Sequence, residues 1–145
     1  MPVINFHIKR IEANKEENLK KEPMKKVDVK SNFTISSIKR EKDERIGDYL
    51  SVNFKFDVTY TPNVGSIKIE GELWYYSKNL DDVILKENKE RIALKGNVSN
   101  EISTAVLQGS IVEAIVIAKK LRLPVPLKLP QVNIKHEKME FKKAS

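Results

Sequence analysis

Few side chains in this sequence are placed to catalyse a reaction or to hold a metal ion. Its two histidines, His7 and His136, lie near opposite ends of the 145-residue chain, and it has no cysteine. A zinc site needs three or four histidine, cysteine or carboxylate ligands in one place. Gly109 and Ser110 fall inside a helical pattern, which matches neither a nucleophile elbow nor a phosphate-binding loop. The sequence therefore predicts neither an enzyme nor a metal or cofactor site.

A long helix is predicted over residues 99–123, and its ends carry ordinary terminal signals. Glu101 lies near its beginning, Lys119 and Lys120 lie near its end, and Pro124 follows it. The apolar residues of this helix form two stripes on opposite sides. One stripe consists of Leu107, Ile111, Ala114, Ile115, Ala118 and Leu121. The other consists of Ile102, Ala105, Gly109, Val112 and Val116.

The second stripe predicts self-association. One stripe can be buried against the chain's own sheet, so the other needs a separate cover. We expect this cover to be a second copy of the chain, with the stripe from Ile102 to Val116 as the interface of a homo-oligomer, a dimer or a tetramer. The alternative is a central helix that is covered on both sides within one subunit.

Four segments before the long helix alternate apolar and polar residues, as half-buried strands do. They cover residues 4–11, 27–35, 50–60 and 66–77. Turn residues at 61–65 predict a hairpin between the third and fourth strands. A short helix is expected to follow, with Leu80, Val83 and Ile84 as its apolar stripe.

This order of elements predicts an α+β fold. We expect a four-stranded antiparallel sheet with one short and one long helix packed on one face. The length is that of a single domain, residues 1–145, with its own core. The charged residues 135–145 are expected to form a frayed tail.

Charge and composition restrict the partners and the location. The net charge is +7, but lysines alternate with acidic residues along the chain, and this mixing disfavours nucleic-acid binding. No uninterrupted apolar run is long enough to span a bilayer, so no membrane contact is expected. The absence of cysteine and of a signal-peptide pattern predicts a cytoplasmic protein.

One pair of aromatic residues lies where polar side chains are expected. Trp74 and Tyr76 fall on the polar face of the fourth predicted strand, together with Lys68, Glu70 and Glu72. An exposed aromatic pair offers a contact surface for an apolar partner. The alternative is that a loop or a second subunit covers these side chains.

Two stretches resemble the SecB family of bacterial export chaperones. Residues 6–11, FHIKRI, are similar to the F-x-I-x-R-I pattern of that family's first strand. Residues 123–134, LPVPLKLPQVNI, are similar to the family's proline-bounded segment that ends in P-V-N-aromatic. The predicted order of elements between them also agrees. Because the chain is basic where the bacterial proteins are acidic, it resembles a distant member, closer to archaeal or toxin–antitoxin-associated relatives.

The resemblance implies dimers that pair into tetramers and hold unfolded polypeptides in apolar grooves without ATP. Carried onto this chain, it implies a client groove formed by Leu19, Met24, Trp74, Tyr76, Leu80, Val83 and Ile84. We therefore expect an ATP-independent holdase for unfolded or nascent polypeptides. The alternatives are an oligomeric assembly or adaptor domain without client binding, and a basic nucleic-acid-binding protein.

Overall fold

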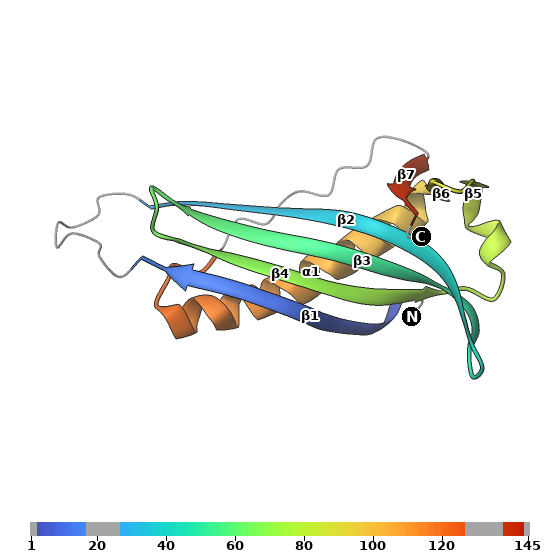
Figure 1. The fold of residues 1–145 in the computed structure, drawn as a ribbon. Helices are drawn as coiled ribbons and strands as arrows, with labels where there is room; N and C mark the ends of the chain where they lie inside the picture. Colours follow the sequence, from blue (N-terminus) through green and yellow to red (C-terminus); the bar gives the residue numbers. More distant parts are fainter. Residues whose placement is uncertain (1–2, 17–26, 127–137, 144–145) are drawn as a thin grey trace.

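Four long strands form one antiparallel sheet in the order β1-β4-β3-β2 (Figure 1). The computed structural model describes residues 3–16, 27–126 and 138–143. The strands are β1 (Val3–Lys15), β2 (Asp28–Asp43), β3 (Gly47–Thr61) and β4 (Gly65–Tyr76). The predicted hairpin between β3 and β4 is confirmed, and the Val64 N–H closes it by donating to the Tyr60 carbonyl at 3.1 Å.

The alternation of β3 and β4 gives the sheet an apolar inner face and a polar outer face. On the inner face Phe54, Phe56 and Tyr60 are each at most 1% exposed, and Ile67 and Ile69 of β4 are fully buried beside them. Burial of such side chains is the main stabilising contribution to the fold, at roughly 1.5–3 kcal/mol each before entropy is counted.

A single long helix, α1 (Gly96–Leu121), runs along the inner face of the sheet (Figure 1). This arrangement confirms the predicted α+β fold class. The side of the helix that is buried contains several small residues. It consists of Val98, Ser99, Ile102, Ser103, Val106, Leu107, Ser110, Ala114 and Ala118. Small side chains on this side let the helix backbone approach the sheet closely.

By length and composition alone, α1 could also cross a membrane. Polar residues interrupt its apolar ones, so the sequence shows no continuous apolar run there. In the structure this helix instead covers the inner face of the sheet, where Val106 and Ala114 are fully buried. Removing it would expose Phe54 and Phe56 to water, at a cost of roughly 25 cal/mol per Å² of apolar surface.

Two serine hydroxyls in α1 are buried without a hydrogen-bond partner among the described residues, those of Ser99 and Ser110. A buried hydroxyl that loses its bonds to water costs free energy, and alanine also has the higher helix propensity. We expect Ser110→Ala to raise the free energy of unfolding by about 1 kcal/mol, measured by urea denaturation. The exposed Thr104→Ala controls for helix propensity, and a Ser110→Ala chain less stable than wild type would contradict this prediction.

Two predictions about the C-terminal half of the chain were wrong. The expected short helix is a single 3-10 turn, η1 (Leu80–Asp82), because the chain then extends into β5 (Ile84–Glu87). The expected frayed tail contains a strand, β7 (Lys138–Lys142), which pairs with β6 (Arg91–Lys95). Residues 135–137, 144 and 145 lie outside the described residues. The order β5-β6-β7 makes a second, three-stranded sheet near the N-terminal end of α1 (Figure 1).

Candidate functional site

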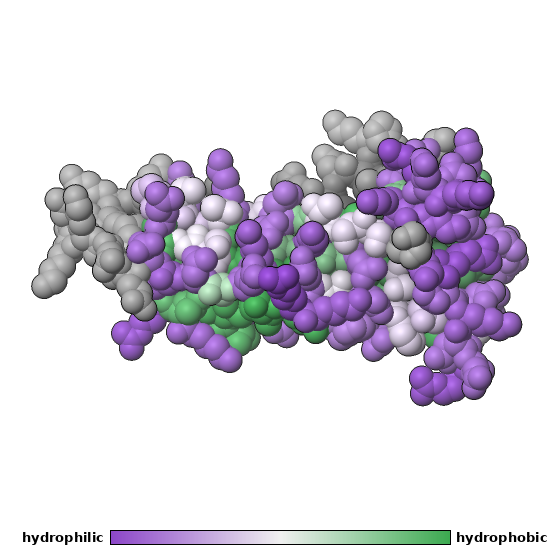
Figure 2. All heavy atoms as spheres, in the orientation of Figure 1, coloured by the Kyte–Doolittle hydropathy of each residue, from purple (hydrophilic) through white to green (hydrophobic). Residues whose placement is uncertain are grey.

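Exposed apolar side chains gather where β1 lies beside the C-terminal half of α1. Val112 is 59% exposed, Val116 is 44% exposed, and Ile11 of β1 is 46% exposed. We call these three residues the apolar band. In Figure 2 hydrophobic surface lies along this side of the molecule, whereas the end that carries the small sheet is mostly hydrophilic.

Two contacts hold β1 beside α1 and place the apolar band. A Cβ atom at Gly109 would lie 2.3 Å from Cζ of Phe6, so the helix touches the Phe6 ring at this point. Further along, Nζ of Lys15 donates to the Arg122 carbonyl at 3.2 Å. Ile11 lies between these two contacts along β1, as Val112 and Val116 do along α1. The three side chains therefore belong to one surface at the edge of the sheet.

The same contacts correct part of the predicted oligomer interface. Ile102 is fully buried in the chain's own core, so a second copy cannot reach it. Gly109 faces Phe6 of β1, and Ala105 is partly buried against the core. The prediction failed there because the stripes left serine out of account, although Ser99, Ser103 and Ser110 lie on the buried side. Val112 and Val116 remain as predicted interface residues.

A second candidate surface lies on the outer face of the sheet. The rings of Tyr49 and Trp74 stack with centroids 4.3 Å apart, and Tyr76 pairs with Tyr49 across β3 and β4. We call Tyr49, Trp74 and Tyr76 the aromatic cluster. Tyr49 is only 8% exposed, whereas Trp74 and Tyr76 are partly buried. The accessible part of the aromatic cluster is therefore provided mainly by Trp74 and Tyr76.

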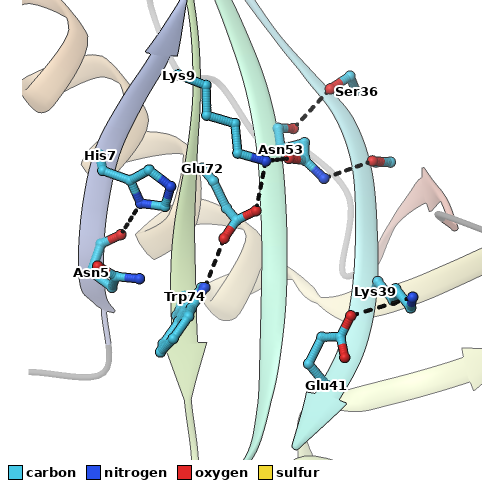
Figure 3. Close-up of polar contacts among 10 residues, drawn as sticks. Asn5, His7, Lys9, Ser36, Lys39, Glu41, Asn53, Glu72 and Trp74 are labelled. Carbon is cyan, nitrogen blue, oxygen red and sulfur yellow. Dashed lines mark hydrogen bonds and ion pairs between the residues drawn. The ribbon is translucent and has the colours of Figure 1, made fainter. Parts of the chain in front are cut away.

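A polar network fixes the orientation of Trp74 (Figure 3). The Trp74 indole N–H donates to Oε1 of Glu72 at 2.8 Å, and Nζ of Lys9 contacts Oε2 of the same carboxylate at 2.9 Å. Lys9 also donates to Oδ1 of Asn53 at 3.2 Å, and the Asn53 amide donates to the Ser37 hydroxyl at 3.1 Å. This network joins all four strands beside the aromatic cluster.

The pKa of Glu72 lies below its ordinary value. Burial of the carboxylate raises this pKa, but the hydrogen bonds from Lys9 and Trp74, with the charge of Lys9 and a smaller effect of His7, together lower it by more. A carboxylate with a depressed native pKa stabilises the fold above its unfolded-state pKa, and this contribution is lost as the pH falls through the native pKa. We expect Glu72→Gln to lower the free energy of unfolding at neutral pH, and the deficit to shrink as the solution is acidified.

The measurement is urea unfolding of wild type and Glu72→Gln between about pH 3 and pH 7. Lys9→Met is the matched background, because it removes the cation that contacts Glu72 at 2.9 Å. In that background we expect Glu72→Gln to cost less at neutral pH than it does in wild type. A deficit that is the same at every pH would contradict the assigned role of Lys9 and Trp74.

The structure separates the residues predicted to form the client groove. Leu80 is only 3% exposed, so the prediction that it contacts clients was wrong; its side chain belongs to the core beneath the 3-10 turn. Val83 and Ile84 are partly buried and pack against that core. Leu19 and Met24 lie outside the described residues. Trp74 and Tyr76 share the outer face and remain candidates.

The chemistry available at these surfaces is that of apolar contact and backbone hydrogen bonding. Among residues 3–16, 27–126 and 138–143, no group of three His, Cys, Asp or Glu side chains could hold a metal ion. β1 pairs with β4 along one edge, and within the described chain no strand pairs with its other edge. An extended polypeptide can add to such an edge through its main chain.

A solved structure supplies a comparison for this arrangement. It is the Mycobacterium tuberculosis SecB-like chaperone Rv1957, determined in complex with a ChAD peptide from the Rv1956 HigA1 antitoxin. The match has a TM-score of 0.60 and covers 90% of this chain and 88% of that chain, at 14% sequence identity. The fold is SecB-like. No protein-family model matches the sequence, and no curated protein does.

Sequence reasoning missed two residues on the candidate surfaces of this SecB-like fold. Ile11 pairs with the inward-facing Ile69, but it lies at the sheet edge after a register shift between Ile8 and Arg10. That shift is invisible in a simple alternation of apolar and polar residues. Tyr49 begins the alternation of β3 on the outer face, and its position opposite Tyr76 depends on the hairpin register.

Proposed function

We propose that the chain is an ATP-independent holdase that binds unfolded or nascent polypeptides as a cytoplasmic homo-oligomer. The observation that carries the proposal is the partly accessible aromatic cluster on the outer face of the sheet, together with the open edge of β1. Binding many different unfolded segments requires accessible apolar surface and backbone groups that can pair with any sequence. The peptide-bound chaperone Rv1957, which shares the fold, supports this assignment.

The two candidate surfaces suggest a division of roles. Val112 and Val116 project from a helix, and helix faces of this kind suit a symmetric contact between two copies. Trp74 and Tyr76 lie on the polar face of the sheet, where their rings offer flat contact area among charged side chains. We assign subunit contact to the apolar band and client contact to the aromatic cluster.

The test is light scattering of a chemically denatured protein that is diluted from guanidinium into buffer with or without the chain. We expect stoichiometric amounts of the chain to slow aggregation, with no effect of added ATP. Leu85→Ser should suppress aggregation as well as the wild-type chain does, because Leu85 is 48% exposed but lies on β5, outside both surfaces. No protection at a large molar excess of the wild-type chain would overturn the proposed function, and self-association without protection would favour an adaptor domain.

A further inference from the structure

The edge of β6 is covered by a strand from the far end of the chain. Five residue pairs join β6 to β7, from Arg91 opposite Lys142 to Lys95 opposite Lys138. Phe141 of β7 is 8% exposed and belongs to the same buried cluster as Ile92 and Leu94 of β6. β7 therefore provides both backbone pairing and an apolar side chain to this edge.

Besides pairing with β6, β7 lies close to β2 and α1. Its other backbone pairing is a single bridge between Ile38 of β2 and Lys143. A hollow of about 780 Å³ lies beside it, lined from β2 by Ser36 and Ser37 and from the small sheet by residues that include Arg91 and Lys142. At its Lys142 end, β7 therefore borders open space between β2 and the small sheet.

Two ion pairs join β7 and the residue after it to β6 and β5. Nζ of Lys143 lies 2.6 Å from Oε2 of Glu87, and the Lys143 N–H donates to the Glu90 carbonyl at 2.9 Å. Arg91 contacts Glu140 at 4.0 Å. The residues seated there, KMEFKK (138–143), alternate apolar and charged side chains and end in two lysines.

We propose that the edge of β6 is a polypeptide-binding site that β7 occupies in cis, and that an extended client segment displaces β7 from it. The site would take segments with apolar residues at every second position, followed by a lysine or arginine that reaches Glu87. The inference rests on the proposed function and adds a location and a sequence preference for one class of client segment.

Displacement is feasible because β7 is only five residues long, so a client segment of similar length can take its place. Its connection to the rest of the chain gives it a high effective concentration at β6, so weak segments do not compete with it. A client with several apolar residues in the right register can replace both its pairing and the Phe141 contact. In this arrangement β7 sets a threshold for client binding.

A disulfide that fastens β7 to β6 tests this exchange in the full-length chain. Arg91 and Lys142 are directly opposed and exposed, and the chain has no cysteine of its own. Opposed residues in antiparallel strands have Cα atoms roughly 4.5–5.5 Å apart, within the range that a disulfide spans. The probe is a fluorescein-labelled peptide that repeats KMEFKK twice, with a version carrying serine in place of Met and Phe as its control.

We expect the Arg91→Cys/Lys142→Cys chain to bind the peptide when reduced and to bind it at least about tenfold more weakly when oxidised. The matched pair is Lys30→Cys/Thr59→Cys, which fastens β2 to β3 at exposed, directly opposed positions. Oxidation of that pair should leave peptide affinity unchanged. Circular dichroism of the oxidised and reduced forms checks that both are folded.

Phe141→Ala provides a second measurement, because it weakens the contact that holds β7. We expect this variant to bind the peptide several-fold more tightly than wild type. Equal affinity in the oxidised and reduced forms, or weaker binding by Phe141→Ala, would overturn the inference. Neither result would affect the proposed function, which is tested separately by the suppression of aggregation by the wild-type chain.

Discussion

Gly71→Ala is expected to lower the free energy of unfolding by about 3 kcal/mol, measured by urea denaturation followed by circular dichroism. Gly71 lies in the middle of β4, opposite Phe54 of β3 and Ile8 of β1. A Cβ atom at this position would lie 2.5 Å from Cζ of Phe54 and 2.6 Å from the His7 carbonyl oxygen. The first contact is with a ring that is 1% exposed and stacks on Phe6, and the second is with backbone. Neither neighbour can move without disturbing the packing of β1.

Two variants separate steric overlap from the general effect of replacing glycine. Gly47→Ala adds a methyl group where nothing lies within 4 Å, so only its φ of +87° opposes the change, at about 1 kcal/mol. Combining Gly71→Ala with Phe54→Leu should cost less than the sum of the two single changes, because the smaller side chain relieves part of the overlap. A Gly71→Ala chain as stable as wild type would contradict the close approach of β1, β3 and β4.

The sheet could be predicted from the sequence because its signal is local and strong. From Leu50 to Tyr60, each inward-facing residue of β3 is large and apolar, and this regularity fixes which side of the strand is buried. The turn residues after Tyr60 then fix the partner strand and its direction. A chain with such a clear apolar face needs a long cover, which the helical segment provides.

The orientation of α1 could not be predicted in the same way. Counting only apolar side chains gave two opposite stripes, whereas the buried side lies between them and includes Ser99, Ser103 and Ser110. A serine can lie on a buried side because it is small, and close packing against a sheet favours small residues. Hydropathy alone therefore missed the serines on the face that contacts the sheet, and Ile102 was assigned to a partner that it cannot reach.

The candidate sites depend on contacts between segments far apart in the sequence. β7 has only two large apolar residues among charged ones, so its sequence predicts a solvated tail until its pairing with β6 is known. The apolar band likewise joins Ile11 to Val112 and Val116 only because β1 runs beside α1. Local patterns supplied Val112, Val116, Trp74 and Tyr76, but not the surfaces to which they belong.

Val112→Glu combined with Val116→Glu is expected to convert a self-associated wild-type chain into a monomer, as measured by sedimentation at micromolar concentration. In a two-fold symmetric contact each residue lies near a copy of the same surface, so the new carboxylates would meet like charges as well as lose apolar burial. We expect the dissociation constant to rise by about a hundredfold or more. The fold itself should persist, because both side chains face solvent in the single chain and glutamate is a good helix former.

Leu85→Glu is the matched control for this change, since Leu85 is 48% exposed and lies on β5, away from the apolar band. It should leave the mass of the assembly unchanged. A wild-type chain that sediments as a monomer, or a double variant that stays associated, would contradict the assignment of the band as the subunit interface. If the monomeric variant still suppressed aggregation, client contact would not require assembly, as expected when clients bind Trp74 and Tyr76 on the opposite face of the sheet.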